Sequence, residues 1–265
     1  MYPHSHHQHD QPILDVQKIS ARYNGSFALE DVSFHLHAGE RIAVVGTNGA
    51  GKSTLFKVVA GVLQPVSGEV TVYGSTPSKH VCIAYITQRS QVDWNFPVSV
   101  ADVVMMGRIA QLGLLGWPKK RDWDLVHEML KIVDLDELAK RQIGELSGGQ
   151  QQRMFIARAL AQEAELMLMD EPLTGLDSPS QEGILALLDT LKNQDVTVMV
   201  ATHDLEQAAE YFDRIMLLNH RLIGLGSPDE VLQTEKLVQA YGGRLRSVDG
   251  DKVLAVDDCC DDHSD

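Results

Sequence analysis

GTNGAGKST, residues 46–54, is the stretch that decides the fold of this chain. It matches the pattern G-x-x-x-x-G-K-[ST], in which the backbone N–H groups of a glycine loop surround phosphate groups. The run RIAVV at 41–45 predicts a short buried strand before the loop, and residues 55–61 predict a helix after it. A helix N-terminus favours an anion because of its dipole. Strand, loop and helix therefore predict a phosphate-binding site, rather than a glycine turn that merely joins two elements.

Side chains in and before this loop suit the binding of a nucleotide. We expect Lys52 to reach the β and γ phosphates and the Ser53 hydroxyl to bind Mg²⁺. Tyr23, which precedes the loop, suits either ordinary strand packing or stacking on a purine base. The other loop residues expected to contact the nucleotide are Gly46, Asn48, Gly49, Ala50, Gly51 and Thr54.

The composition is that of a globular protein with a sizeable core. The chain has 265 residues, of which 44% are hydrophobic, enough for one large domain or two modest ones. It contains no uncharged apolar run of about 18 residues, and its His-rich start differs from a signal peptide, so we expect a cytosolic protein. The formal net charge of −14 argues against a nucleic-acid partner. Three cysteines, Cys82, Cys259 and Cys260, form no disulfide framework, which favours a reducing compartment.

The order of the predicted elements indicates an α/β fold. Alternation of apolar and polar residues predicts half-exposed antiparallel strands at 13–19 and 32–36. From residue 98 to about residue 164 the pattern is helical, which predicts a helical insert. A strand, a helix and a second strand follow, and this order predicts a parallel sheet with a right-handed crossover. Further strands are expected at 68–74, 81–86, 166–169, 196–201, 215–218 and 221–224, and helices at 98–106, 123–133, 180–191, 228–233 and 235–241.

The chain is expected to form one central domain between two irregular ends. Residues 1–12 contain four histidines and two prolines without periodicity, and residues 249–265 are rich in Asp. We interpret these ends as a disordered N-terminus and an acidic flexible tail around a domain at 13–248, with a helical insert at about 89–164. The ends also contain side chains that suit zinc, copper or nickel, without a regular finger spacing. These side chains are His4, His6, His7, His9, Asp10, Cys259, Cys260 and His263.

Two adjacent carboxylates follow the predicted strand at 166–169. Asp170 and Glu171 are expected at the carboxyl edge of the sheet, where open α/β folds bind ligands. We expect Asp170 to hold Mg²⁺ and Glu171 to orient the attacking water or accept its proton. A solvated Asp-Glu pair at a strand end is common in proteins, so this assignment depends on the phosphate loop.

A histidine and a glutamine occupy corresponding positions on other predicted strands. His203 lies three residues after Val200, at the same expected edge, and we predict that it reaches the γ-phosphate. A lone histidine is otherwise more often structural. Gln88, also at a strand end, is able to coordinate Mg²⁺ and to contact the nucleophilic water. With Lys52 and Glu171, these two residues form the predicted catalytic set.

The sequence LSGGQ at 146–150 predicts a second helix start that suits an anion, with Ser147 as its cap. One nucleotide has one γ-phosphate, so the simplest interpretation is that this helix start binds the nucleotide held by a second copy of the chain. The chain would then form a head-to-tail homodimer in the presence of ATP, with two ATP molecules at the interface. The alternative is a capped helix after a glycine turn. The residues concerned are Ser147, Gly148, Gly149 and Gln150.

The motifs and their order along the chain resemble those of the ATP-binding subunit of an ABC transporter, and the resemblance covers about residues 13–245. The one departure is Thr174-Gly175, where many members have Ser-Ala or Ser-Gly. The resemblance implies a P-loop ABC-type ATPase that uses ATP and Mg²⁺, with a mixed sheet core, an antiparallel β subdomain and a helical insert. The corresponding parts are the Walker A loop at 46–54, the glutamine loop at Gln88, the signature at 146–150, Walker B at 166–172, the D-loop at Leu176-Asp177, the switch histidine His203 and the adenine-stacking Tyr23.

A longer stretch gives a finer resemblance. QRSQVDWNFPVSV at 88–100 and DVVMMGR at 102–108 resemble the ATPases of the manganese, zinc and iron importer branch, most closely its manganese members. In that branch this segment lines a groove that receives a coupling helix of a membrane permease. The resemblance therefore implies a permease partner, an extracytoplasmic metal-binding protein that acts indirectly, and a position at the cytoplasmic face of the cell membrane. Trp94 and Phe96 are candidates for an aromatic docking site, or alternatively anchor the helical insert to the sheet.

The resulting hypothesis is an ATP-hydrolysing subunit that powers import of a divalent transition metal, with manganese favoured and zinc or iron as alternatives. A soluble ABC ATPase that acts on DNA or ribosomes is the first competitor from another class. Such proteins commonly carry a long coiled coil or two cassettes, whereas the interval between Gln88 and Leu146 is short and the chain is acidic. The second competitor is a metal-storing or metal-sensing protein that acts through its termini.

Overall fold

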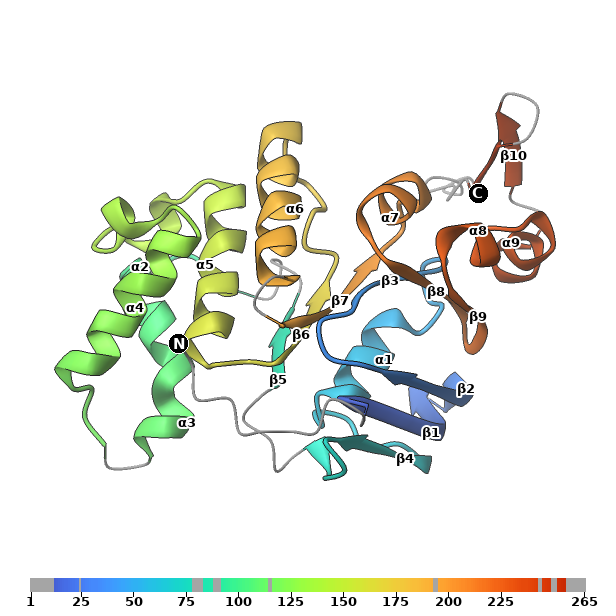
Figure 1. The fold of residues 1–265 in the computed structure, drawn as a ribbon, viewed down its shortest axis with the longest axis horizontal. Helices are drawn as coiled ribbons and strands as arrows, with labels where there is room; N and C mark the ends of the chain where they lie inside the picture. Colours follow the sequence, from blue (N-terminus) through green and yellow to red (C-terminus); the bar gives the residue numbers. More distant parts are fainter. Residues whose placement is uncertain are drawn as a thin grey trace, which may run out of the picture.

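In a computed structural model, a six-stranded sheet, a three-stranded sheet and a group of helices make up most of the fold (Figure 1). The structure describes residues 12–23, 25–77, 83–87, 92–113, 116–192, 195–242, 245–248 and 252–255. Several expectations fall outside these ranges. They concern Gln88, Cys82, the His-rich residues 1–11, and the side chains Cys259, Cys260 and His263 near the C-terminus.

Within the described part of the chain, the larger sheet has six strands in the order β5-β6-β7-β3-β8-β9. Neighbouring strands are parallel except for β8 and β9, which form an antiparallel hairpin. Strands β6 and β7 are buried almost throughout, as is typical of parallel strands covered on both faces. The parallel sheet and the hairpin predicted from the sequence are thus confirmed. The strands are β5 (Ile83–Ile86), β6 (Leu166–Asp170), β7 (Thr197–Thr202), β3 (Arg41–Val45), β8 (Arg214–Asn219) and β9 (Arg221–Gly226).

Helix α1 lies between the larger sheet and a three-stranded antiparallel sheet (Figure 1). Phe56 of α1 is fully buried in an apolar cluster that joins α1 to residues of both sheets. Alternation along β3 divides its side chains between the two faces of the larger sheet. Ile42 and Val44 join the α1 cluster, whereas Ala43 and Val45 join a second cluster on the opposite face. The elements are α1 (Lys52–Val59), β1 (Leu14–Tyr23), β2 (Ser26–Leu36) and β4 (Ser67–Val72).

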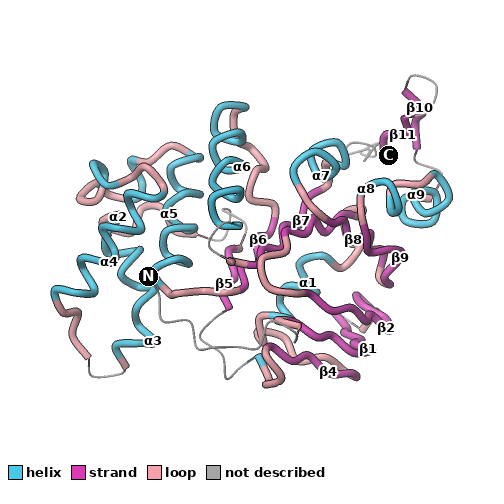
Figure 2. Tube along the Cα trace, in the orientation of Figure 1, coloured by secondary structure: helices cyan, strands magenta, loops and turns pink. Residues whose placement is uncertain are grey.

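Helices cover the opposite face of the larger sheet and extend to one end of the molecule (Figure 2). Buried residues such as Met129 of α4, Met154 of α5 and Leu188 of α6 form one apolar cluster with the sheet. Among the described residues, no helix combines the length and the hydropathy needed to cross a membrane. The helices are α2 (Val100–Met105), α3 (Ile109–Leu112), α4 (Lys120–Ile132), α5 (Gly148–Ala161), α6 (Ser178–Lys192), α7 (Leu205–Tyr211), α8 (Pro228–Val231) and α9 (Thr234–Tyr241), with short 3₁₀ turns at Met106–Arg108, Asp136–Leu138 and Ile143–Glu145.

Three elements differ from what the sequence pattern predicts. Strand β2 begins at Ser26, earlier than expected, because Gly25 adopts a positive φ of 86° and lets β1 turn directly into β2. Helix α7 is additional, and the Asp204 side chain caps it by accepting the Gln207 N–H. In the stretch expected to be a flexible tail, β11 (Lys252–Ala255) forms an antiparallel pair with β10 (Leu245–Val248), which pairs the backbone groups along the inner edge of each strand.

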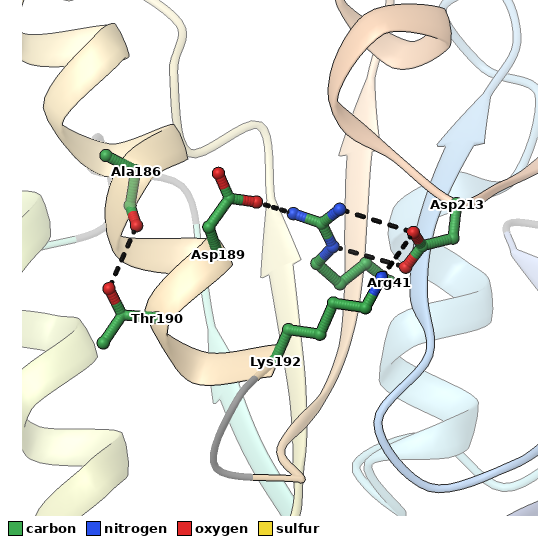
Figure 3. A network of polar contacts seen from close by, with 6 residues as sticks. All are labelled: Arg41, Ala186, Asp189, Thr190, Lys192 and Asp213. Carbon is green, nitrogen blue, oxygen red and sulfur yellow. Dashed lines mark hydrogen bonds and ion pairs between the residues drawn. The ribbon is translucent and has the colours of Figure 1, made fainter.

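A charged network holds α6 against the ends of β3 and β8 (Figure 3). Arg41, at the start of β3, donates to both carboxylate oxygens of Asp213, at 3.3 and 3.4 Å, and also to Asp189 of α6. The Lys192 ammonium donates to the same Asp213 at 2.7 Å. Burial alone would raise the pKa of Asp213, but the hydrogen bonds from Arg41 and Lys192 outweigh it, so this pKa lies below its ordinary value. The network fixes the sheet edge opposite the phosphate loop.

Asp213→Asn removes the carboxylate that Arg41 and Lys192 share. We expect the free energy of unfolding to fall by about 1 kcal/mol at neutral pH, a small effect because water reaches this site. Because folding lowers this pKa, the stabilisation is full above the ordinary aspartate value of 3.8 and is lost as pH falls through the folded value. Chemical denaturation of the parent chain and the variant at several pH values should therefore show a difference that vanishes in acid.

The control is Asp124→Asn, which changes an exposed carboxylate of α4 that forms no ion pair with the described residues. A difference between Asp213→Asn and the parent chain that persists unchanged in acid would contradict the role given to the network.

Candidate nucleotide-binding site

The parallel strands β6, β7 and β3 lie side by side and end at one edge of the sheet. Asp170 pairs with Ala201, and Val45 pairs with Thr202. The residue after each strand, at positions 46, 171 and 203, therefore leaves the sheet at the same edge. This is the arrangement expected from the sequence, and it is the edge where open parallel sheets bind ligands.

The phosphate loop between β3 and α1 needs glycine at Gly51, which precedes the first residue of the helix. Gly51 has φ 98°, and a Cβ atom there would lie 2.4 Å from the Ala28 carbonyl oxygen. The turn between β8 and β9 supports the loop from another side. The His220 N–H donates to the Ala50 carbonyl at 2.8 Å, and the His220 Nδ1 lies 3.2 Å from the Ala28 carbonyl oxygen. Strand β2, the loop and this turn therefore hold one another in place.

Lys52 is buried within this loop, with 6% of the residue exposed. Its ammonium donates to the carbonyl oxygens of Gly46 at 2.5 Å and Thr47 at 3.1 Å. A buried ammonium is costly unless polar groups surround it, and these carbonyl oxygens are among the groups that do so here. The loop thus combines a fixed cation with a helix N-terminus, which is an arrangement that suits a phosphate group.

A cavity of about 340 Å³ opens above the loop, a volume within the range of small-molecule sites. Tyr23 lines it and is 64% exposed, so strand packing does not account for this side chain. Phe27 lies beside it, with the Arg22 guanidinium 4.2 Å from the ring centroid. An exposed aromatic at one end and a phosphate loop at the other suit a nucleotide. The lining residues are Tyr23, Ser26, Phe27, Ala28, Thr47, Asn48, Gly49, Ala50, Gly51, Lys52, Ser53, Thr54, Glu171 and His220.

The two carboxylates at the end of β6 have different surroundings. The Tyr85 hydroxyl donates to Asp170 at 3.4 Å. Burial, the charge of Asp170 and this hydrogen bond raise the pKa of Tyr85 well above its ordinary value, so the phenol keeps its proton and remains a donor. Glu171 leaves the strand direction with φ 50°, and its side chain lines the cavity. The Thr174 hydroxyl donates to Glu171 at 3.4 Å, while the Glu171 N–H donates to the Ala201 carbonyl.

The predicted residues His203 and Ser147 to Gln150 are not among those that line this cavity. His203 is exposed just beyond β7 and is not among the lining residues, and Gln88 lies outside the described ranges. Ser147 caps α5, where its hydroxyl accepts the Gln150 N–H at 3.3 Å and the Gln150 side chain accepts the Ser147 N–H at 3.0 Å. A Cβ atom on Gly149 would lie 2.5 Å from the Ser180 hydroxyl, so the start of α5 packs closely on α6.

The start of α5 and the phosphate loop do not meet within one chain. Helix α5 lies in the helical part of the molecule, whereas α1 lies beneath the central sheet, well apart from it in the view of Figure 1. The residues at 147–150 and the cavity above α1 therefore do not form a single site in the isolated chain.

Three residues of the site are not predicted from the sequence. Phe27 and His220 reach the cavity because separate hairpin turns approach the phosphate loop, and no local pattern reveals such an approach. Tyr85 occupies an ordinary position in an apolar strand, and only the pairing of β5 with β6 places it near Asp170.

Taken together, the loop, the buried lysine and the carboxylates beyond the neighbouring strand define the class of P-loop nucleotide-binding proteins. The family described as "ABC transporter" matches residues 29–174 of the chain. The chain belongs to this family, and the α/β P-loop ATPase predicted from the sequence is confirmed.

Named relatives and a solved structure agree with this assignment. The chain is 44% identical to the manganese transport system ATP-binding protein MntB of Bacillus subtilis, over 91% of this chain and 97% of the relative. It is 45% identical to the zinc transport system ATP-binding protein TroB of Treponema pallidum, over 88% of each chain. A solved metal-chelate type ABC transporter in an inward-facing conformation aligns with a TM-score of 0.78 and 31% identity, over 87% of this chain and 89% of the other.

Gly51→Ala and Gly49→Ala form a matched pair that tests the phosphate loop. Both glycines have positive φ, but at Gly49 a Cβ atom would meet nothing within 4 Å, whereas at Gly51 it would meet the Ala28 carbonyl. We expect Gly49→Ala to cost about 1 kcal/mol of stability through backbone strain alone. Gly51→Ala should cost a further 1–3 kcal/mol, because β2 must move, and should also weaken ATP binding. Thermal unfolding and ATP titration measure both effects; equal losses in the two variants would show that the close approach of β2 is unimportant.

Proposed function

We propose that this chain is the ATP-hydrolysing subunit of an importer of a divalent transition metal, with manganese favoured and zinc or iron as alternatives. The observation that carries the proposal is the single cavity that Tyr23, the phosphate loop and Glu171 share. The similarity to manganese and zinc transport ATP-binding proteins over most of the chain supports the choice of cargo.

In this proposal, ATP lies in the cavity with its base on the Tyr23 ring and its phosphates in the loop. The backbone N–H groups of residues 48–54 and the Lys52 ammonium neutralise phosphate charge. The Lys52 ammonium, which donates to the carbonyl oxygens of Gly46 and Thr47, would also contact the triphosphate.

Mg²⁺ is the cofactor that this donor set fits. A hydroxyl, a carboxylate and an amide oxygen are hard oxygen ligands of the kind Mg²⁺ prefers, and Ser53, Asp170 and Gln88 supply them. When bound, Mg²⁺ neutralises charge on the phosphates and helps to orient them. Tyr85 holds Asp170 by a hydrogen bond, which restricts the carboxylate to one orientation.

We assign the positioning of the attacking water to Glu171, His203 and Gln88. Glu171 lies in the cavity, and as a carboxylate it is able to accept a proton from water or to orient it. His203 follows the neighbouring strand at the same sheet edge, from which it would contact the γ-phosphate. Hydrolysis of one triphosphate then requires no covalent intermediate with the protein.

A second copy of the chain completes each site in this account. The start of α5 lies apart from the phosphate loop of its own chain, yet it offers a capped helix N-terminus of the kind that binds anions. We propose a head-to-tail homodimer formed in the presence of ATP. In it, Ser147, Gly148, Gly149 and Gln150 of one chain contact the γ-phosphate held by the other.

Glu171→Gln tests the proposed role of this carboxylate in hydrolysis. We expect kcat for ATP hydrolysis to fall by about 10²–10⁴-fold, because an amide cannot accept the proton, while ATP binding persists. Steady-state hydrolysis and an ATP titration measure the two quantities. The matched control is Glu235→Gln, the same change at an exposed position of α9, which should hydrolyse ATP like the parent chain. Unchanged turnover in Glu171→Gln would remove Glu171 from its role.

The permease is proposed to dock on the helical part of the chain through a coupling helix. A hollow of about 100 Å³ between β5 and α5 is lined by Val92, Phe155 and Arg158 among others. Trp94 packs edge-on against Phe155, with ring centroids 5.8 Å apart, so it also anchors this segment to the helices. Phe96 is 56% exposed and remains available to a partner. The chain would thus lie at the cytoplasmic face of the membrane, and an extracytoplasmic metal-binding protein would act on it only through the permease.

Phe96→Ala tests the docking surface without disturbing the core. We expect ATP hydrolysis by the isolated chain to be unchanged, and affinity for the detergent-solubilised permease to fall by roughly 10-fold, the effect of a loss near 1–2 kcal/mol for an exposed aromatic anchor. The matched control is Val62→Ala, which truncates another exposed apolar side chain, 69% exposed and distant in sequence. Equal permease affinity in both variants would exclude Phe96 from the contact.

The cargo is tested by reconstitution with the permease and its binding protein. Hydrolysis of ATP that is stimulated by Mn²⁺ more than by Zn²⁺ or Fe²⁺ would support manganese. Stimulation by zinc or iron alone would replace that choice and leave the ATPase assignment intact.

A further inference from the structure

The turn between α3 and α4 presents an exposed tryptophan next to three exposed cations. Trp117 is 86% exposed, the highest value among the large hydrophobic residues that the structure describes as exposed. Lys119, Lys120 and Arg121 follow it and are exposed as well. We call Trp117, Lys119, Lys120 and Arg121 the basic corner. Figure 1 places α3 and α4 at the end of the molecule opposite β8 and β9.

The stability of α4 does not explain these cations. Lys120 is the first residue of the helix and Lys119 precedes it, so the positive charges lie where the helix dipole is also positive, which is unfavourable. Within the described residues, neither Lys119 nor Lys120 takes part in an ion pair. Arg121 approaches only Asp122, at 4.0 Å, with 79% of its side chain exposed. The chain as a whole carries a net charge of −14, so such a concentration of positive charge is unusual for it.

Gly113 and Gly116 are held close to α3, which also presents an exposed apolar side chain. The Gly116 N–H donates to the Gly113 carbonyl at 3.3 Å, and the Gly113 N–H donates to the Ile109 carbonyl at 3.1 Å. A Cβ atom on Gly116 would collide with the Leu112 carbonyl, so Gly116 lies against the end of α3. Ile109 on α3 is itself 61% exposed.

We propose that the basic corner contacts the anionic lipid headgroups of the membrane that holds the permease. This inference rests on the proposed function, which places the chain at that membrane. Tryptophan prefers the boundary between headgroups and hydrocarbon, and lysine and arginine next to it are attracted to anionic lipid. The exposed Asp124, one helical turn after Lys120, lowers the net positive charge of the basic corner, whereas physiological salt screens charges beyond about 8 Å.

A cytoplasmic loop of the permease is the alternative partner for this surface. A protruding anchor such as Trp117 needs a shaped pocket on a protein partner, whereas insertion into a fluid interface needs none, and the three cations beside it match the charge of anionic lipid. Lipid therefore fits the geometry better.

Vesicle binding by the full chain tests the proposal. We expect co-sedimentation with vesicles of phosphatidylcholine mixed with phosphatidylglycerol, weakened by salt, and none with phosphatidylcholine alone. The variant Lys119→Gln/Lys120→Gln/Arg121→Gln should bind about 100-fold more weakly, since each cation near the surface contributes about a factor of five. Its matched control, Lys131→Gln/Lys140→Gln/Arg141→Gln, removes the same charge from exposed positions elsewhere in the helical part and should bind like the parent chain.

Tryptophan fluorescence gives a second readout of the same contact. Emission should shift to the blue on mixing with the anionic vesicles, and Trp117→Phe should abolish that shift.

Absence of vesicle binding by the parent chain, or equal weakening of vesicle binding in both triple variants, overturns the proposal. So does a basic-corner variant that binds vesicles normally but fails to bind the solubilised permease, because the surface is then a protein contact.

Hydrolysis of ATP by the permease complex separates this inference from the function on which it rests. Metal-stimulated hydrolysis without vesicle binding means that only the lipid contact is wrong. Loss of metal stimulation in the complex of the parent chain means that the proposed function itself fails.

Discussion

The candidate site depends on one geometric constraint, the parallel pairing of β6, β7 and β3. Because these strands run in one direction and are in register, the chain leaves all of them at one sheet edge. The phosphate loop, the Asp170-Glu171 pair and His203 are far apart in sequence and meet only through this pairing. The opposite edge is fixed by Arg41, Asp189, Lys192 and Asp213, so the strands are held at both ends. An apolar cluster on each face of the sheet excludes other registers.

The same sheet separates two layers of the molecule. One face carries α1 and the antiparallel strands, which shape the cavity for the nucleotide. The other face carries the helices, and the segments that connect them include the exposed residues Phe96 and Trp117. Helix α5 belongs to this second layer, yet its capped N-terminus has the chemistry of a phosphate site. In the proposed homodimer, this N-terminus would contact the phosphate held by the second copy, and ATP would then link dimerisation to movement of the helices.

Local patterns predicted much of this fold, and their limits are physical. The glycine loop, the buried strands and the LSGGQ cap each have a local cause, namely φ freedom, continuous burial and side-chain capping, so the sequence reveals them. The approach of Phe27 and His220 to the loop depends on how distant hairpins pack, which no short segment encodes. The early start of β2 depends on one glycine, and β11 depends on its pairing with β10. The role of Gln88 remains a prediction, since it lies outside the described residues.

The central claim is that two chains share each triphosphate. Sedimentation velocity of the parent chain, with Mg²⁺ and an ATP analogue that resists hydrolysis, tests it most directly. The account predicts a species of twice the monomer mass that requires the analogue, and predicts that Ser147→Arg abolishes this species while the analogue still binds. A chain that binds the analogue and stays monomeric at all accessible concentrations would contradict the account.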